Sequence, residues 1–126
     1  MSDSPYFEKK TGFRHLLAAA GYSMNGATRL LQEAAARDEI IAYIVAMMLF
    51  SLIGATLLHY LVLTLLFLLL LAIEALNTAI EEVVDHISRD YSIAARNAKD
   101  LGSFAAFCIL SIIFVFTGYV AIDLLT

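Results

Sequence analysis

Long stretches without a charged side chain alternate with short charged ones along this chain. Residues 40–73 contain no charged residue other than a histidine, and residues 101–122 contain none at all. As a helix, the first stretch would extend about 50 Å, well beyond a hydrocarbon core of about 30 Å. We therefore predict two membrane spans there, residues 40–58 and 61–83, joined by a tight turn around residues 56–60. Residues 101–122 form the third predicted span.

The N-terminal part has a different pattern. Residues 1–10 are polar and predict a mobile tail. Residues 11–37 predict an amphipathic helix in the membrane surface and a charged collar, with Arg14 and Arg29 directed toward lipid headgroups. Gly21 and Gly26 weaken this helix. A soluble helix that packs on a partner is the alternative. The apolar face consists of Phe13, Leu16, Leu17, Ala20, Met24 and Leu31.

Composition agrees with a membrane protein. Of the 126 residues, 61% are hydrophobic and 16% are charged, whereas a soluble domain of this length carries more charge. The single cysteine, Cys108, excludes an internal disulfide, and the polar N-terminus shows no cleaved signal peptide. The expected fold is therefore an all-α membrane protein, with a surface helix and three transmembrane helices in one domain over residues 1–126. Three helices enclose little of a polar site alone, so we expect an oligomer.

The basic residues predict the orientation in the membrane. All eight fall either before the first predicted span or in a predicted loop at residues 84–100, which three spans place on the same side. By the positive-inside rule, this side, with the N-terminus, is cytoplasmic. The eight residues are Lys9, Lys10, Arg14, Arg29, Arg37, Arg89, Arg96 and Lys99.

A polar stripe follows the second predicted span. Its members, Glu74, Asn77, Glu81 and Asp85, are spaced by three, four and four residues, so they share one helix face. An ionisable group inside a span is costly unless it is paired or faces a cavity. Glu74 could be a protonated hydrogen-bonding group between helices, but such packing needs one polar contact rather than four in register. The stripe instead favours a site for a divalent metal and phosphates at the membrane surface.

Other polar residues near the expected cytoplasmic surface extend this site. Glu33 and Glu81 are candidate Mg²⁺ ligands, because Mg²⁺ is often held by one or two carboxylates together with substrate phosphates. An exposed Glu33 on a surface helix is the ordinary alternative. Lys99 is a candidate phosphate contact, while Asp100 is either part of the site or a helix N-cap. The sequence contains no Gly-rich phosphate loop, no His/Cys metal cluster and no Ser/His/Asp arrangement.

A resemblance to a known family runs through the segment EALNTAIEEVVDHISRDYSIAARNAKDLGS. It is similar to the signature of the small bacterial integral-membrane diacylglycerol kinases, and the stretches TGF…AAGYS at residues 11–23 and EAAARDE at residues 33–39 resemble that family too. The match covers most of the chain in order. Its central residues are Glu74, Asn77, Thr78, Ala79, Ile80, Glu81, Asp85, Tyr91, Ala98, Lys99 and Asp100.

This resemblance implies a lipid kinase that transfers the γ-phosphate of ATP to diacylglycerol, giving phosphatidic acid, with Mg²⁺ as the metal. It also implies a homotrimer in the bacterial cytoplasmic membrane, with sites shared between chains and no nucleic-acid partner. Glu74 would be the general base, with Asn77 as a neighbouring catalytic or positioning group, and Glu33 and Glu81 the metal ligands. The nucleotide would contact Tyr22, Glu33, Glu81, Asp90, Lys99 and Asp100, and the lipid would contact Ser23, Glu39 and Ser103.

Two positions depart from the family pattern. His15 stands where the family often has an arginine, with Arg14 one position earlier, and Ser92 stands where some relatives have a histidine. Three other functions remain open at this point: an undecaprenol kinase with the same central motif, an ion-coupled transporter that uses Glu74 as its proton-binding carboxylate, and a non-catalytic membrane subunit.

Overall fold

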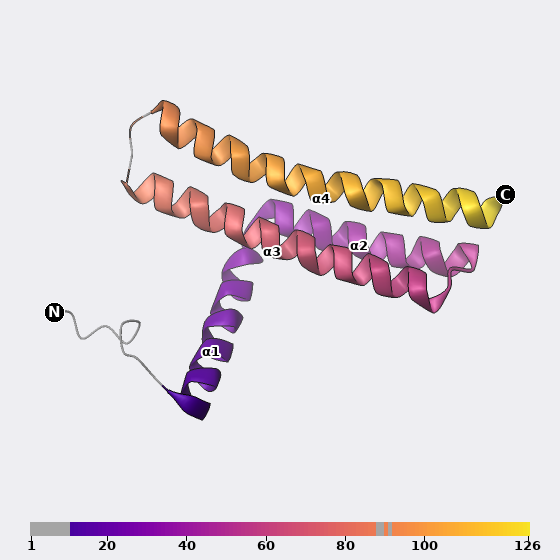
Figure 1. Cartoon of the computed structure of the whole chain (residues 1–126), viewed down its shortest axis with the longest axis horizontal. Coiled ribbons are helices and arrows are strands. Elements are labelled where there is room, and N and C mark those ends of the chain that lie inside the picture. Colours follow the sequence, from indigo (N-terminus) through magenta and orange to yellow (C-terminus); the bar gives the residue numbers. More distant parts are fainter. Residues whose placement is uncertain (1–10, 88–89, 91) are drawn as a thin grey trace.

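The computed structural model describes residues 11–87, 90 and 92–126, and these form four helices. Helices α2, α3 and α4 run side by side in alternating directions, while α1 projects away from one end of this bundle (Figure 1). The all-α prediction is therefore confirmed. The predicted tail at residues 1–10, Arg89 and Tyr91 lie outside the described residues. The helices are α1 Gly12–Leu30, α2 Ala34–Ile53, α3 Leu57–Ile87 and α4 Ile93–Leu125.

Two of the described helices, α3 and α4, are long and apolar enough to cross a membrane. Few of their apolar residues are buried within the chain, so most of this surface is left for lipid or for other chains. Helix α2 is shorter and includes Arg37, Asp38 and Glu39 near its start. Its uncharged part, residues 40–53, is about 14 residues long and extends roughly 21 Å.

The turn between α2 and α3 comes earlier than the sequence predicts. Helix α2 ends at Ile53, where Gly54 adopts a left-handed conformation with φ of 78°, and α3 already begins at Leu57. Two hydrogen bonds between Thr56 and His59 cap the start of α3. The Thr56 backbone N–H donates to His59 Nδ1 at 3.1 Å, and the His59 backbone N–H donates to Thr56 Oγ1 at 3.4 Å. This pairing follows the logic of a capping box. The predicted turn at residues 56–60 was therefore misplaced.

The predicted loop at residues 84–100 is also mostly helical. Helix α3 continues to Ile87, and α4 begins at Ile93, where the Ser92 side chain accepts a hydrogen bond from the Ala95 N–H at 3.0 Å. Serine is a favoured residue at this capping position. Because α3 and α4 both extend past the apolar runs, their polar ends form a two-helix projection at one end of the bundle (Figure 1).

Helix α1 is continuous through Gly21 and Gly26 and ends at Leu30, so the collar at residues 33–39 belongs almost entirely to α2. None of the residues of α1 is buried. Phe13, Leu16 and Met24 are all more than 60% exposed. The apolar face predicted for this segment is thus free within the chain, as a helix in a membrane surface requires.

The core lies toward the end of the bundle that carries the C-terminus. Phe50, Leu63 and Val120 are almost fully buried and come from α2, α3 and α4. Midway along the bundle, Tyr43 stacks on Phe67 with ring centroids 4.2 Å apart. Its hydroxyl also bonds Thr64 Oγ1 at 2.8 Å. These contacts fix α2 against α3 and leave the opposite end of the bundle for polar residues.

Candidate functional site

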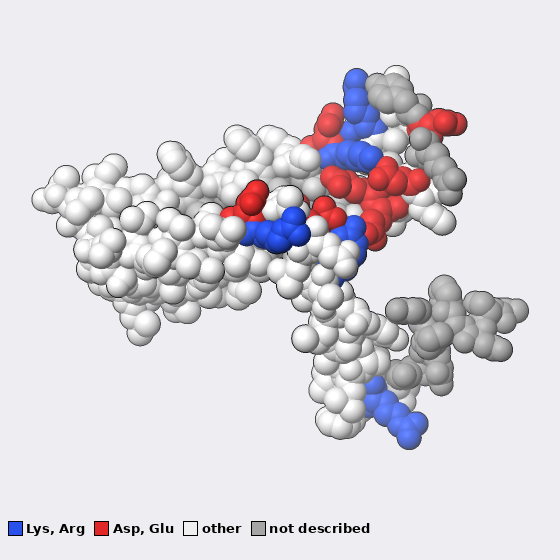
Figure 2. All heavy atoms as spheres, turned by 180° about the vertical axis from the view of Figure 1, so that it is seen from behind, with Lys and Arg blue, Asp and Glu red and all other residues white. Residues whose placement is uncertain are grey.

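Charged side chains gather at one end of the bundle. Figure 2 shows acidic and basic residues over the polar ends of the helices, while the rest of the bundle in this view is uncharged. The acidic residues of this end include the stripe on α3, and the basic residues include Arg29 and Lys99. A charged end next to an apolar bundle is where water-soluble and lipid reactants can meet.

Four polar residues of the described chain are buried, and they lie near the boundary between the apolar and charged parts. Glu74, Asn77 and Thr78 on α3 are each 7% exposed, and Glu39 on α2 is 9% exposed. Glu39 Oε2 and Asn77 Oδ1 are buried without a hydrogen-bond partner among the described residues. Buried polar atoms are normally satisfied, so two unpartnered ones in one region point to a ligand or to an unusual contact.

Glu39 and Glu74 are close enough to influence one another. Glu39 lies one residue before the first predicted span. Burial raises the pKa of Glu39 to about 7, and the negative charge of Glu74 contributes in the same direction. Because a pKa near 7 leaves a large protonated fraction at neutral pH, Glu39 can donate a hydrogen bond as well as accept one.

The structure brings the two candidate metal ligands to the same region. Glu33 and Glu81 both interact electrostatically with Glu74, although they belong to the start of α2 and to α3. Asn77 Nδ2 also donates to Glu81 Oε1 in a long, weak bond of 3.4 Å. Within the described part of the chain, no three His, Cys, Asp or Glu side chains form a group that could enclose a metal ion. Two carboxylates suit Mg²⁺, which retains water and substrate phosphates as further ligands.

Arg29 links three parts of the chain. Its guanidinium donates to Glu33 Oε1 at 2.7 Å and to Glu82 Oε1 at 2.6 Å, and so joins the end of α1 to the start of α2 and to α3. The sequence predicted that Arg29 points toward lipid headgroups, and the structure shows its partners within the chain, Glu33 and Glu82. The i,i+4 spacing of Arg29 and Glu33 in the sequence could have predicted their ion pair. Nothing in the sequence indicates the contact between Arg29 and Glu82.

Lys99 pairs with the last member of the stripe. Its Nζ lies 2.6 Å from Asp85 Oδ1, and Glu81 is a second electrostatic neighbour. Asp100 follows on α4 but is exposed. Because α4 begins at Ile93, Asp100 is about two turns inside the helix and cannot cap it.

The remaining predicted site residues are spread out. Tyr22 and Ser23 are exposed on α1, which stands away from the bundle (Figure 1). Asp90 is exposed between α3 and α4, and Ser103 is exposed on α4. Within one chain, the structure thus gathers Glu33, Glu39, Glu74, Asn77, Glu81 and Lys99.

The sequence reasoning missed one close contact of the site. Gly102 on α4 faces Asn77 so closely that a Cβ built on the glycine would lie 2.1 Å from Asn77 Oδ1. Gly102 is itself buried. Small residues commonly allow membrane helices to approach each other. The presence of a glycine in this helix was the sequence feature from which a close helix contact could have been predicted.

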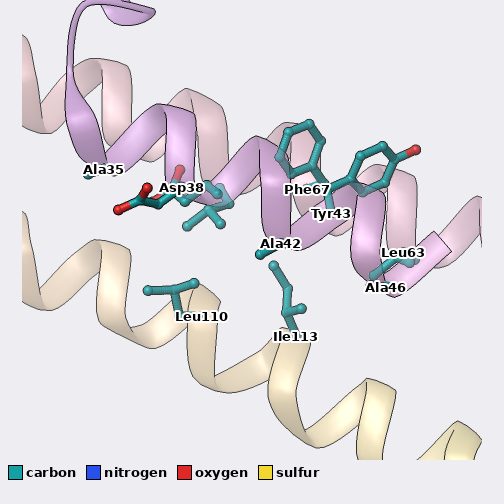
Figure 3. A pocket seen from close by; sticks show the side chains of 11 residues that line it. Ala35, Asp38, Ala42, Tyr43, Ala46, Leu63, Phe67, Leu110 and Ile113 are labelled. Carbon is teal, nitrogen blue, oxygen red and sulfur yellow. The ribbon is translucent and has the colours of Figure 1, made fainter. Parts of the chain in front are cut away.

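A mainly apolar cavity of about 380 Å³ opens between α2, α3 and α4. Figure 3 shows the Asp38 carboxylate near Ala35 at one end, while Leu110 and Ile113 of α4 face α2 across the space. Tyr43 and Phe67 line it from α2 and α3, and Glu39 belongs to the same lining. Such a cavity can accept an apolar chain whose polar head remains at the carboxylate end.

Comparisons with known proteins agree with one another. The family model of prokaryotic diacylglycerol kinases matches residues 21–122. A diacylglycerol kinase from Sinorhizobium sp is 53% identical over 115 residues, which cover 91% of this chain and 84% of the relative. A diacylglycerol kinase from Pseudomonas aeruginosa is 36% identical over 116 residues, covering 91% and 94%. One from Escherichia coli strain K12 is 37% identical over 108 residues, covering 85% and 88%.

Proposed function

The chain belongs to the prokaryotic diacylglycerol kinase family, and we propose on that basis that it transfers the γ-phosphate of ATP to the hydroxyl of diacylglycerol. The products are phosphatidic acid and ADP. The observation that carries this function is the match with relatives of that name over most of the chain. The buried Glu74 beside Asn77 at the boundary of the charged end supports it, because a lipid hydroxyl lies at that depth.

Glu74 is the general base of the reaction. Its carboxylate accepts the proton of the lipid hydroxyl while that oxygen forms a bond to the γ-phosphorus, and the bond from this phosphorus to the ADP oxygen breaks. Positioning and charge neutralisation supply most of the rate enhancement in such a transfer. Asn77, one helical turn further along α3, fixes the groups around Glu74 through its carboxamide.

Residues from three parts of the chain hold the nucleotide. Lys99 contacts a phosphate of ATP as a point charge, and its neighbour Asp100 contacts the nucleotide as well. Tyr22 lies near the adenine, and Asp90 lies close to the nucleotide. The ion pair between Lys99 and Asp85 supports this assignment, since it holds the ammonium at the charged end of the bundle.

Glu33 and Glu81 hold Mg²⁺ when it is bound. The donor set fits this ion, because both are carboxylates near Glu74 and Mg²⁺ needs few protein oxygens when substrate phosphates complete its shell. The ion would neutralise charge on the β- and γ-phosphates. The bond from Arg29 to Glu33 keeps one candidate ligand turned toward α3.

The lipid contacts Ser23, Glu39 and Ser103. One of its two acyl chains can occupy the cavity of about 380 Å³, whose carboxylate end includes Glu39. A Glu39 side chain that is protonated part of the time can donate to an ester carbonyl oxygen of the glyceride. This arrangement directs the free hydroxyl toward Glu74.

The active form is a homotrimer of three-span protomers in the bacterial cytoplasmic membrane, with the N-terminus in the cytoplasm. The uncharged part of helix α2, residues 40–53, lies in the first span, and sites are shared between neighbouring chains. The large exposed apolar surface of the bundle supports this assembly, as does the projection of α1, the helix that carries Tyr22 and Ser23, away from the bundle (Figure 1).

The direct test uses purified protein in detergent micelles with ATP, with and without Mg²⁺, and with diacylglycerol or undecaprenol as the acceptor. We expect phosphatidic acid to form only with Mg²⁺ present, and diacylglycerol to be the better acceptor. Phosphorylation of undecaprenol alone would change the substrate assignment. Absence of any lipid phosphorylation, with intact oligomers, would overturn the proposed function.

A further inference from the structure

Among the glycines of the described structure, Gly102 lies closest to a side chain of another helix. A Cβ on Gly102 would meet Asn77 Oδ1 at 2.1 Å, Cγ at 3.1 Å and Cβ at 3.6 Å. The other glycine of α4, Gly118, has no atom within 4 Å of the equivalent position. The two glycines therefore stand in opposite environments on one helix.

The same contact accounts for one of the unpartnered buried atoms. Asn77 Oδ1 has no conventional hydrogen-bond donor among the described residues. Its distance from the ideal Cβ position, together with a carbon–carbon bond of about 1.5 Å, places it within about 3.6 Å of Gly102 Cα. Carbon–oxygen distances of about 3.3–3.6 Å are those of Cα–H···O contacts. A weak contact of this kind from the Gly102 Cα–H is therefore within reach of Asn77 Oδ1.

We propose that Gly102 is a positioning residue that acts through Asn77. The open face of the glycine holds the Asn77 carboxamide with its oxygen against α4 and its Nδ2 toward Glu81. Asn77 thereby keeps one orientation beside Glu74. This inference rests on the proposed function, because it concerns the residues that carry out the lipid phosphorylation.

General helix packing does not explain the requirement for glycine. Ala98 and Ala106 lie one turn before and one turn after Gly102 on the same face of α4, and both are at least partly buried. A methyl group is therefore accommodated above and below this position. The atom that a methyl at 102 would displace is the tip of a side chain rather than the backbone of α3. Rotation of the Asn77 carboxamide would relieve the clash and leave the two helices together.

The test compares Gly102→Ala with Gly118→Ala, which adds the same methyl to the same helix in open space. We expect Gly102→Ala to lower turnover roughly 10-fold to 10²-fold, as a misplaced reacting group does, with helicity and oligomeric state unchanged. KM for ATP should change much less than turnover. Gly118→Ala should keep the activity of the unmodified enzyme. Equal turnover in the two variants would overturn the proposal.

A double-mutant cycle identifies the residue through which Gly102 acts. In Asn77→Ala the clashing atoms are absent, and the remaining Cβ would lie 3.6 Å from the new methyl, an ordinary contact. Gly102→Ala should therefore reduce turnover no further in that background. A reduction by the same factor in both backgrounds would show that Gly102 acts on α3–α4 packing, and full activity of Asn77→Ala would equally overturn the proposal.

A double-mutant cycle on stability tests this contact independently of the proposed function. It also tests the contact if a variant is too unstable for its activity to be interpreted. Unfolding midpoints in SDS-containing micelles are measured for both single variants and the double variant. Gly102→Ala should lower the midpoint only when Asn77 is present. If the unmodified protein phosphorylated no lipid but this coupling appeared, the contact would stand and the kinase assignment would fail. Additive shifts would overturn the contact itself.

Discussion

Replacement of Glu39 by glutamine should remove a specific pH dependence of stability. The substitution keeps the size of the side chain but makes it permanently neutral. In the unmodified protein, burial and the nearby Glu74 raise the pKa of Glu39 from 4.5 to about 7. The folded protein therefore binds more protons at this carboxyl than the unfolded chain does between these two pH values. Its free energy of unfolding should fall as the pH rises through this window and should be constant above it.

The shift sets the size of the effect. One pKa unit corresponds to about 1.4 kcal/mol, so ionised Glu39 costs the folded protein up to about 3 kcal/mol above pH 7. Glu39→Gln does not carry this cost. The variant should match the unmodified protein near pH 4.5 and should be more stable by up to about 3 kcal/mol at pH 8.

The assay is equilibrium unfolding in mixed micelles with increasing SDS, followed by far-UV circular dichroism at several pH values between 5 and 8. Asp38→Asn is the matched control, because Asp38 is the neighbouring carboxylate on α2 but is exposed. It should keep the pH dependence of the unmodified protein. An unchanged pH dependence in Glu39→Gln would refute the reasoning that burial holds this carboxyl in its neutral form.

Three further predictions concern the charged end. Glu33→Gln and Glu81→Gln should each weaken Mg²⁺-dependent use of ATP while assembly stays intact, and wild-type activity across a Mg²⁺ titration would exclude that residue as a ligand. Mixed oligomers of inactive Glu74→Gln and inactive Glu33→Gln chains should regain activity if sites are shared, whereas no recovery in verified mixtures favours sites within one chain. Arg29→Met removes the ion pairs with Glu33 and Glu82 and should therefore increase protease cleavage of α1, and unchanged cleavage would argue against an anchoring role of Arg29.

The helices could be predicted from the sequence better than their ends. Apolar runs longer than a bilayer predict two adjacent membrane helices in residues 40–83, and the structure has a turn between helices within that stretch. The turn was misplaced because Gly54 and the reciprocal Thr56–His59 contact decide where the helices end. The same is true of Ser92, whose capping bond begins α4 well before the apolar run. Such local hydrogen bonds act over three residues and leave no trace in hydrophobic periodicity.

The candidate site was only partly accessible to sequence reasoning. Helical spacing placed Glu74 and Asn77 on one face, and the structure buries both. Spacing cannot bring Glu33 at the start of α2 close to α3, because that depends on how Arg29 ties α1 to α3. The burial of Glu39 and the contact between Asn77 and Gly102 likewise arise from packing between helices. The sequence contains these residues, but only the packed bundle shows their relation.

The central claim is that Glu74 accepts the proton of the lipid hydroxyl. Glu74→Gln keeps the volume of the side chain and one acceptor oxygen but cannot take up that proton, so turnover and ATP affinity should be measured on the same purified variant. We expect lipid phosphorylation to fall roughly 10²-fold or more, the usual range for loss of such a group, with ATP affinity and oligomeric state unchanged. Activity within a few-fold of the unmodified enzyme would contradict the assignment, and loss of ATP binding or assembly would show instead that Glu74 holds the site together.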